Sequence, residues 1–123
     1  MGLILVVDDE LDGGRLVQRV LSASGHKVHS MTDPEQAMNW LQINTPDLVL
    51  LDIKLRGRSW ISVLEYLHQN LPRVKVVMVT GCPSAETRDK ARAFGVQDYL
   101  IKPIELDELE NRINRLLGGG FKI

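Results

Sequence analysis

The chain has 123 residues, of which 44% are hydrophobic and 25% are charged, and this composition is typical of one globular domain with a single core. Its fifteen basic and sixteen acidic residues give a formal net charge of -1, which excludes a strong overall attraction to nucleic acid or anionic lipid. The sequence contains no apolar stretch of the roughly 20 residues that a membrane helix needs and no signal-like start, so we expect a cytoplasmic protein.

Five short runs of β-forming residues recur along the chain, and each is followed by a segment long enough for a helix. The runs are LILVV (3–7), KVHSM (27–31), LVLL (48–51), KVVMVT (75–80) and DYLIK (98–102). Four of them are nearly continuous in apolar residues, which favours strands buried on both faces of a parallel sheet. KVHSM contains more polar residues, as is typical of an edge strand.

Helix signals occupy the segments between these runs. The first helix is expected over Arg15–Ala23. The pair Gly13-Gly14 in front of it disfavours helix formation, and the sequence gives no reason for two glycines at this place. The clearest helix start is at Asp33-Pro34, an N-cap followed by proline at the first helical position, with a capping-box partner behind it. Further helices are expected around Ile61–Leu67, over Ser84–Phe94 and over Leu106–Leu116.

Five strands that alternate with five helices predict an α/β domain with a five-stranded parallel sheet, doubly wound as in flavodoxin-like folds. Right-handed crossovers would place the five helices on both faces of the sheet. The strand order 2-1-3-4-5 is one of two common arrangements, and it would make the first, third, fourth and fifth runs neighbours. We assign residues 1–117 to this domain and 118–123 to a flexible tail or the start of a linker, because consecutive glycines disfavour fixed structure.

Polar residues end four of the five runs. Asp8 and Asp9 follow the first, Asp52 follows the third, and Thr80 and Lys102 end the fourth and fifth. The carboxyl ends of parallel strands meet at one edge, so these residues predict a single polar patch. Three crowded carboxylates repel one another, and Mg²⁺ or Mn²⁺, which prefer oxygen ligands, would remove that conflict. With Lys102 the charges then balance, and the site suits a phosphoryl group whose phosphorus is attacked by one carboxylate.

These residues resemble the conserved set of receiver domains in two-component response regulators. The resemblance rests on four blocks at the spacing of that family, VVDDE, DLVLLDIKL, VVMVTG and FGVQDYLIKP, and runs from about residue 3 to residue 117. It implies that Asp52 accepts the phosphoryl group. It also implies that Asp9 and Asp52 ligate Mg²⁺ directly, that Asp8 binds it through water, and that the backbone carbonyl of Lys54 completes the protein ligands.

The resemblance assigns further roles around the same site. Thr80 and Lys102 would hold the phosphoryl oxygens, and the Lys102-Pro103 peptide bond would be cis. On phosphorylation Thr80 would move toward the phosphoryl group and Tyr99 would swing inward, so that the face formed by the fourth helix, fifth strand and fifth helix is remodelled. Lys54 and Cys82 occupy positions that tune hydrolysis in the family. For Cys82, the only cysteine, the sequence itself favours a plain loop side chain.

The loop after Asp52 departs from the usual family pattern. Arg56 replaces a proline, and Trp60 replaces a glycine that often relieves a turn. Trp60 is therefore expected near the site, either as a packing residue or as a docking residue for a partner. Arg56 and Arg58 would either be solvated loop charges or contact an acidic partner surface.

The resemblance implies a signalling module that takes a phosphoryl group from the phosphohistidine of a sensor histidine kinase or a phosphotransfer protein. Such a domain would catalyse its own phosphorylation and dephosphorylation without turning over a substrate. We expect no membrane contact and no direct binding to nucleic acid, and the family offers homodimerisation through the fourth helix, fifth strand and fifth helix. Two other functions stay open: an interaction module that ignores phosphate, and a phosphatase or mutase with an aspartyl nucleophile.

Overall fold

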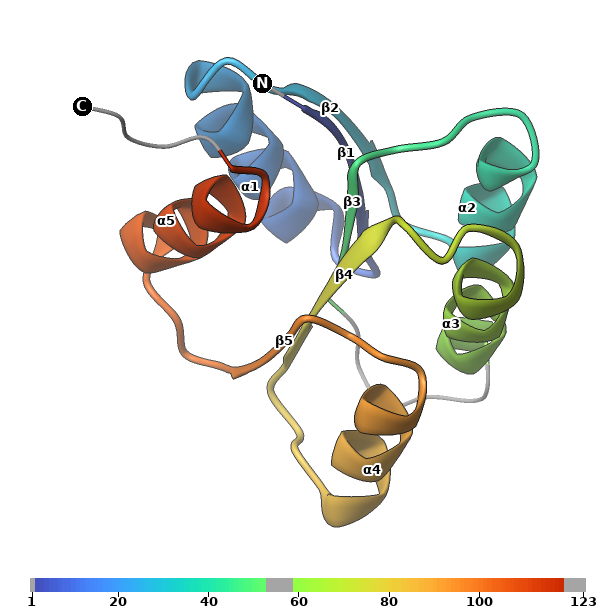
Figure 1. Ribbon diagram of the computed structural model, residues 1–123. Coiled ribbons are helices and arrows are strands. Elements are labelled where there is room, and N and C mark those ends of the chain that lie inside the picture. The colour runs from blue at the N-terminus through green and yellow to red at the C-terminus, as the bar shows by residue number, and fades with distance from the viewer. Residues whose placement is uncertain (1, 53–58, 119–123) are drawn as a thin grey trace.

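The computed structural model describes residues 2–52 and 59–118, and within them five strands alternate with five helices (Figure 1). None of these helices is long and apolar enough to cross a membrane. In chain order the elements are β1 (Leu3–Asp8), α1 (Leu11–Ala23), β2 (Lys27–Met31), α2 (Pro34–Leu41), β3 (Leu48–Asp52), α3 (Ser59–Asn70), β4 (Lys75–Thr80), α4 (Ala85–Ala93), β5 (Asp98–Ile101) and α5 (Leu106–Leu116).

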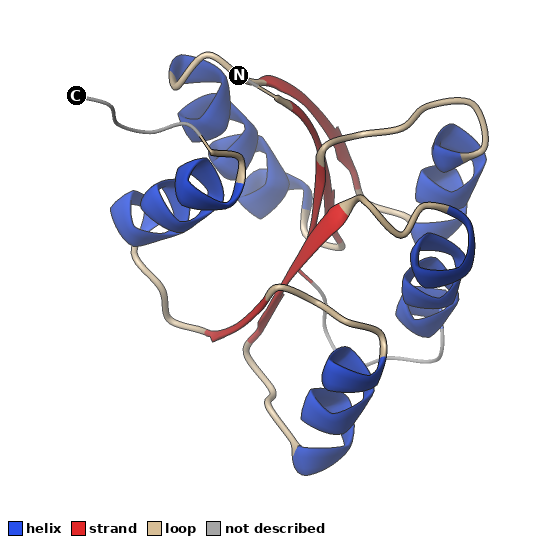
Figure 2. Ribbon diagram, viewed as in Figure 1, coloured by secondary structure: helices blue, strands red, loops and turns tan. Residues whose placement is uncertain are grey.

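The strands form one parallel sheet in the order β2-β1-β3-β4-β5, which confirms the predicted fold class and strand order (Figure 2). Helices α1 and α5 cover one face of this sheet, and α2, α3 and α4 cover the other (Figure 1). Strand β2 lies at one edge and is only partly buried, as its mixed composition predicted. All five residues of β3, in contrast, are buried.

Two hydrophobic cores lie on opposite faces of the sheet because side chains alternate along each strand. In β1, Ile4 and Val6 pack with residues of α1 and α5, whereas Leu5 and Val7 pack with residues of α2, α3 and α4. Trp60, at the start of α3, belongs to the second of these cores and is only 5% exposed. The packing interpretation of Trp60 is therefore confirmed, and the docking interpretation is wrong.

Helix α1 begins at Leu11, four residues before the predicted start at Arg15. Gly13 and Gly14 consequently lie inside its first turn, and the backbone N–H of Gly14 donates to the carbonyl of Glu10 at 3.1 Å. Each glycine disfavours the helix by up to about 1 kcal/mol relative to alanine, and tertiary packing overrides this local preference here. The strand ends also differ slightly from prediction, because β1 includes Asp8, β3 includes Asp52, and β5 ends at Ile101, one residue before Lys102.

Most of the other helix signals agree with the structure, although the cap of α2 is a single bond and not the predicted capping box. The side chain of Asp33 caps α2 by accepting a hydrogen bond from the backbone N–H of Glu35 at 3.0 Å. Ser84 caps α4 in a capping box with Thr87. Gly25 and Gly95, which follow α1 and α4, adopt φ angles of 97° and 72° that favour glycine. Lys54, Arg56 and Arg58, and all of the predicted tail except Gly118, lie outside the described residues.

Candidate functional site

The carboxyl ends of the four neighbouring strands bring together the polar residues that the sequence predicts. Asp8 ends β1 and Asp52 ends β3, and the two are directly paired in the strand register. Thr80 ends β4, and Lys102 follows β5 immediately. Asp9, the remaining acid, lies in the short link between β1 and α1 and is exposed. The predicted patch therefore exists, and it is formed by adjacent strand ends.

Lys102 forms an ion pair with Asp52 at the centre of the patch. The distance between Lys102 Nζ and Asp52 Oδ1 is 2.7 Å, and the two side chains are 40% and 12% exposed. The backbone N–H of Lys102 donates to the carbonyl oxygen of Thr80 at 2.8 Å, which anchors the start of this segment to β4. The Lys102-Pro103 peptide bond that follows is cis, as the sequence resemblance implied.

Asp8 is the most deeply buried acid of the patch, with 2% of its surface exposed. Its Oδ1 accepts a hydrogen bond from the backbone N–H of Glu10 at 2.9 Å. Burial raises the pKa of Asp8 to about 6; the hydrogen bond from Glu10 opposes this rise, and repulsion from Asp52 adds to it. In the absence of a cation, the ionised form of this carboxylate therefore lowers the stability of the folded protein.

Asp52 and Lys102 influence each other's ionisation. Burial raises the pKa of Asp52, although the hydrogen bond and charge of Lys102 oppose the rise. Desolvation alone would lower the pKa of Lys102, but its hydrogen bond to Asp52 and the surrounding negative charges outweigh that effect and raise it. Lys102 therefore stays protonated, and it offsets only part of the negative charge that Asp8, Asp9 and Asp52 place at this edge.

Thr80 carries a buried hydroxyl group at the end of β4, the strand that pairs with the strand of Asp52. Only 1% of the residue is exposed, and its Oγ1 accepts a hydrogen bond from the backbone N–H of Cys82 at 3.0 Å. A hydroxyl that accepts one hydrogen bond can still donate its own proton. Cys82 itself is exposed, in keeping with the loop residue that the sequence favoured.

The acidic residues of the patch fit a hard divalent cation by their chemistry. They offer carboxylate oxygens, which Mg²⁺ and Mn²⁺ prefer, and burial raises the pKa values of Asp8 and Asp52 despite the hydrogen bonds that oppose the rise. Among the described residues no three His, Cys, Asp or Glu side chains converge as a closed ligand group. Mg²⁺ does not require one, because it is typically held by one or two carboxylates and retains several waters. The carbonyl of Lys54 lies outside the described residues.

An open cavity of about 490 Å³ adjoins the patch. Its polar side is formed by Asp8, Glu10, Asp52 and Lys102, and the remainder is mostly apolar. The apolar part comes from α1, the end of β4 and the residue after it, the segment between β5 and α5, and α5 itself, and consists of Gly13, Leu16, Val17, Val79, Gly81, Pro103, Ile104, Leu106 and Leu109. The sequence did not predict these apolar lining residues or the position of Glu10 in the cavity, because none of them ends a strand.

Tyr99, the predicted switch residue, lies on the far side of β5 from this cavity and is linked to α4. Its hydroxyl lies 3.0 Å from Oγ1 of Thr87, and the guanidinium of Arg88 lies 5.6 Å from the centre of its ring. Thr87 also takes part in the capping box of α4. The phenol is thus connected to the first turn of that helix.

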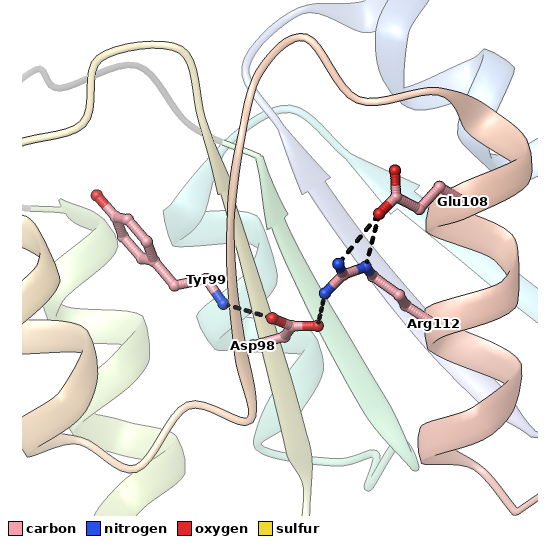
Figure 3. A network of polar contacts seen from close by, with 4 residues as sticks. All are labelled: Asp98, Tyr99, Glu108 and Arg112. Carbon is pink, nitrogen blue, oxygen red and sulfur yellow. Dashed lines mark hydrogen bonds and ion pairs between the residues drawn. The ribbon is translucent and has the colours of Figure 1, made fainter.

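A network of charged side chains joins β5 to α5 (Figure 3). Arg112 contacts Asp98 at 2.9 Å and Glu108 at 3.0 Å, and Asp98 also accepts a hydrogen bond from the backbone N–H of Tyr99 at 3.1 Å. The sequence reasoning did not single out this network. The spacing of Glu108 and Arg112, four residues apart on one helix, was the available signal.

Known proteins share both sequence and fold with this chain. The family model described as "Response regulator receiver domain" matches residues 4–114. The chain is 32% identical over 114 residues to the regulatory protein AtoC of Escherichia coli (strain K12), and 34% identical over 112 residues to the transcriptional regulatory protein DltR of Streptococcus agalactiae. These alignments cover 93% and 89% of this chain but 25% and 49% of the relatives, so the chain spans a quarter to a half of their length.

A solved structure shows the same similarity in three dimensions. It is the crystal structure of a CheY-like response regulator receiver domain protein from Methanospirillum hungatei JF-1. The TM-score is 0.90 at 27% identity, and the superposition covers 96% of this chain and 94% of the other. The similarity thus extends over the whole sheet and its helices.

Proposed function

We propose that this chain, which belongs to the family of response regulator receiver domains, acts as a signalling module in which Asp52 accepts a phosphoryl group. The observation that carries the proposal is the ion pair of 2.7 Å between Lys102 Nζ and Asp52 Oδ1. It lies where Asp8 and Thr80 end the neighbouring strands. A nucleophile, a cation, a hydroxyl donor and further carboxylates are therefore gathered at one edge of the sheet, which is the set that aspartyl phosphorylation needs.

The proposed donor is a phosphohistidine of a sensor histidine kinase or a phosphotransfer protein, and the proposed location is the cytoplasm. A carboxylate oxygen of Asp52 attacks phosphorus and the bond between phosphorus and the imidazole nitrogen breaks. The electron pair of that bond returns to the ring nitrogen, which takes up a proton. Lys102 supports this step because its ammonium favours the ionised form of Asp52 and can then pair with a phosphoryl oxygen. Thr80 can donate its hydroxyl proton to a second phosphoryl oxygen.

Mg²⁺, or Mn²⁺ in its place, is the proposed cofactor. When bound, the ion would neutralise part of the negative charge that accumulates when a phosphoryl group approaches carboxylates. Asp9 and Asp52 are the proposed direct ligands, Asp8 would bind a water of the ion, and the carbonyl of Lys54 would complete the set. The raised pKa values of Asp8 and Asp52 support the proposal, because burial disfavours both carboxylates and repulsion between acids adds to this, and a cation would favour their ionised forms.

The apolar cavity beside the patch is the proposed entry for the phosphohistidine donor. Leu11 and Leu16, both on α1, are 51% and 46% exposed, and Leu16 lines the cavity together with Pro103 and Ile104. Exposed apolar side chains next to a charged site are typical of a surface that a protein partner covers. A donor protein that covers these residues could present its histidine to Asp52, which lines the same cavity.

The proposed output is a change on the face formed by α4, β5 and α5. Movement of Thr80 toward the phosphoryl group would let Tyr99 turn inward. In the described structure the hydroxyl of Tyr99 lies within hydrogen-bond distance of Thr87, so an inward turn would break a contact with the first turn of α4. Through this coupling the phosphorylated site could alter the surface that a downstream partner, or a second copy of the chain, recognises.

The lifetime of the phosphoryl group is a property of the same site. We propose that the two positions that tune it are those that lie two residues after Asp52 and Thr80, Lys54 and Cys82, and that Lys54 contributes more because Cys82 is favoured as a plain loop side chain. The domain would return to its resting state by hydrolysis of its own aspartyl phosphate, without turnover of a separate substrate. Replacing Lys54 by alanine and measuring the half-life of the phosphoryl group tests this role, and an unchanged half-life would contradict it.

The proposed function is tested by mixing the purified protein with acetyl phosphate and Mg²⁺ and measuring its intact mass. The expected result is the addition of one phosphoryl group, absent when EDTA removes the metal and absent in Asp52→Asn. Beryllofluoride, which mimics an aspartyl phosphate, should bind under the same conditions. Wild-type protein that gains no mass and binds no beryllofluoride would instead favour a phosphate-independent interaction module, and continuous phosphate release from sugar phosphates would favour a phosphatase.

A further inference from the structure

The glycine pair in the first turn of α1 has a structural cause. A Cβ atom at position 13 would lie 2.7 Å from Oδ2 of Asp8, closer than real Cβ atoms approach their neighbours. A Cβ atom at position 14 would lie 2.7 Å from Oγ of Ser30 and 3.3 Å from Cβ of Asp8. Both glycines therefore allow α1 to approach the end of β1, and Gly13 is the one that faces the carboxylate itself.

Asp8 has little freedom to avoid a side chain at position 13. It is buried, and its side chain is short, with only two rotatable bonds. Its Oδ1 accepts the hydrogen bond from the backbone N–H of Glu10, and its strand is paired on one side with β2 and on the other with β3. A methyl group at position 13 would thus require the carboxylate to turn, and the turn would disturb the bond to Glu10.

Gly13 also borders the cavity that contains Asp8, Asp52 and Lys102. A side chain there would occupy space next to the patch as well as displace one of its acids. Helix propensity, in contrast, favours alanine over glycine at this position, because glycine loses more backbone entropy when a helix forms. The helix alone gives no reason for glycine, whereas the contact with Asp8 does.

We propose that Gly13 is a positioning residue, whose missing side chain sets the orientation in which the Asp8 carboxylate serves the cation site. This inference rests on the proposed function, because it assumes that Mg²⁺ binds at this edge of the sheet. Gly13 acts on the ion only through Asp8. Loss of a group that orients a metal-binding residue typically lowers metal affinity by about 10-fold to 100-fold, and we expect Gly13→Ala to fall at the lower end of that range.

The test is a calorimetric Mg²⁺ titration of wild type and Gly13→Ala, combined with urea unfolding of both proteins without metal. We expect the affinity of Gly13→Ala for Mg²⁺ to be about 10-fold lower while the metal-free protein unfolds cooperatively. The matched control is the double variant Gly14→Ala/Ser30→Ala. It adds the same methyl group to the same turn but removes the Ser30 hydroxyl that this methyl would meet. The contact that remains, at 3.3 Å, is with Cβ of Asp8 and not with its carboxylate, so the Mg²⁺ affinity of this control should fall less than that of Gly13→Ala.

Asp8→Ala provides the decisive second comparison. Without the carboxylate, Gly13→Ala should cause no further loss of Mg²⁺ affinity, and it should raise the urea midpoint of the metal-free protein because only the helix propensity remains. If Gly13→Ala alone does not fold, Asp8→Ala should rescue its folding, and failure of that rescue would overturn the inference. Equal Mg²⁺ affinity of wild type and Gly13→Ala would also overturn it, whereas wild type that binds no Mg²⁺ would contradict the proposed function itself.

Discussion

Two clusters of charge on this domain show what burial does to an ion pair. At the carboxyl edge of the sheet one ammonium, that of Lys102, pairs with Asp52 while Asp8 lies next to it in the strand register. On the face of β5 and α5 one guanidinium, that of Arg112, bridges Asp98 and Glu108 (Figure 3). The contact distances are alike, at 2.7 Å and 2.9 Å, but the surroundings are not.

The difference lies in solvent access. The side chains of Asp98 and Glu108 are 27% and 54% exposed, so water screens their charges and the network costs little to form. Asp8 is 2% exposed and burial raises its pKa to about 6, so its ionised form is disfavoured in the folded protein. The Arg112 network is an ordinary surface network, whereas the cluster of Asp8, Asp52 and Lys102 retains an uncompensated buried charge that a bound cation would stabilise.

The largest expected effect comes from removing the buried charge at position 8. Because the folded-state pKa of about 6 exceeds the unfolded value of 3.8, ionised Asp8 opposes folding, and stability is lost as pH rises through this interval. Asp8→Asn should therefore be as stable as wild type near pH 4 and more stable by about 3 kcal/mol at pH 7 in the absence of metal. Urea unfolding of both proteins across this pH range, in EDTA, measures the difference.

Magnesium gives the control for that comparison. Saturating Mg²⁺ should stabilise wild type more than Asp8→Asn and so narrow the gap at pH 7. If the free energies of unfolding of wild type and Asp8→Asn differed by the same amount at pH 4 and pH 7, the ionised form of Asp8 would not oppose folding.

A smaller effect is expected from Lys102→Met, which keeps the length of the side chain and removes its charge. The metal-free variant should lose about 1 kcal/mol at pH 7.5, the upper end of the values typical of exposed pairs, since Lys102 is 40% exposed and Asp52 is 12% exposed. Thermal or urea unfolding in EDTA measures it. Unchanged or increased stability would mean that Lys102 does not compensate the carboxylates around it.

The smallest effect is expected from the matched change Arg112→Met on the surface network. The charges of Asp98 and Glu108 remain accessible to water after the guanidinium is removed, so the urea midpoint should move less than in Lys102→Met. The shift should also shrink in high salt. A larger loss of stability than that of Lys102→Met would reverse the comparison between the two clusters.

The sheet and most of the polar edge could be predicted from sequence because both follow from short-range patterns. Continuous apolar runs indicated strands buried on both faces, and the residues that end those runs indicated the edge where Asp8, Asp52, Thr80 and Lys102 meet. The start of α1 was predicted too late, because the glycine pair is explained by the close approach of Gly13 to Asp8 and not by local preference.

Contacts between distant residues were beyond the reach of these patterns. The pairing of Arg112 with Asp98 depends on how α5 packs against the sheet, and no periodic pattern in the sequence predicts which residues of the helix and the strand meet. The burial of Trp60 was left open for the same reason, since an aromatic residue near a loop suits both a core and a docking surface. The structure places it in the core between the sheet and its helices.

We propose that Asp52, and not a neighbouring acid, carries the phosphoryl group. The most direct measurement is to phosphorylate the protein with acetyl phosphate and Mg²⁺, reduce the acyl phosphate with borohydride, and locate the modified residue by peptide mass spectrometry. We predict that the reduced residue is found at position 52 in wild type and at no position in protein treated with EDTA. Modification of Asp8 or Asp9 in place of Asp52, or modification that is independent of Mg²⁺, would contradict the account.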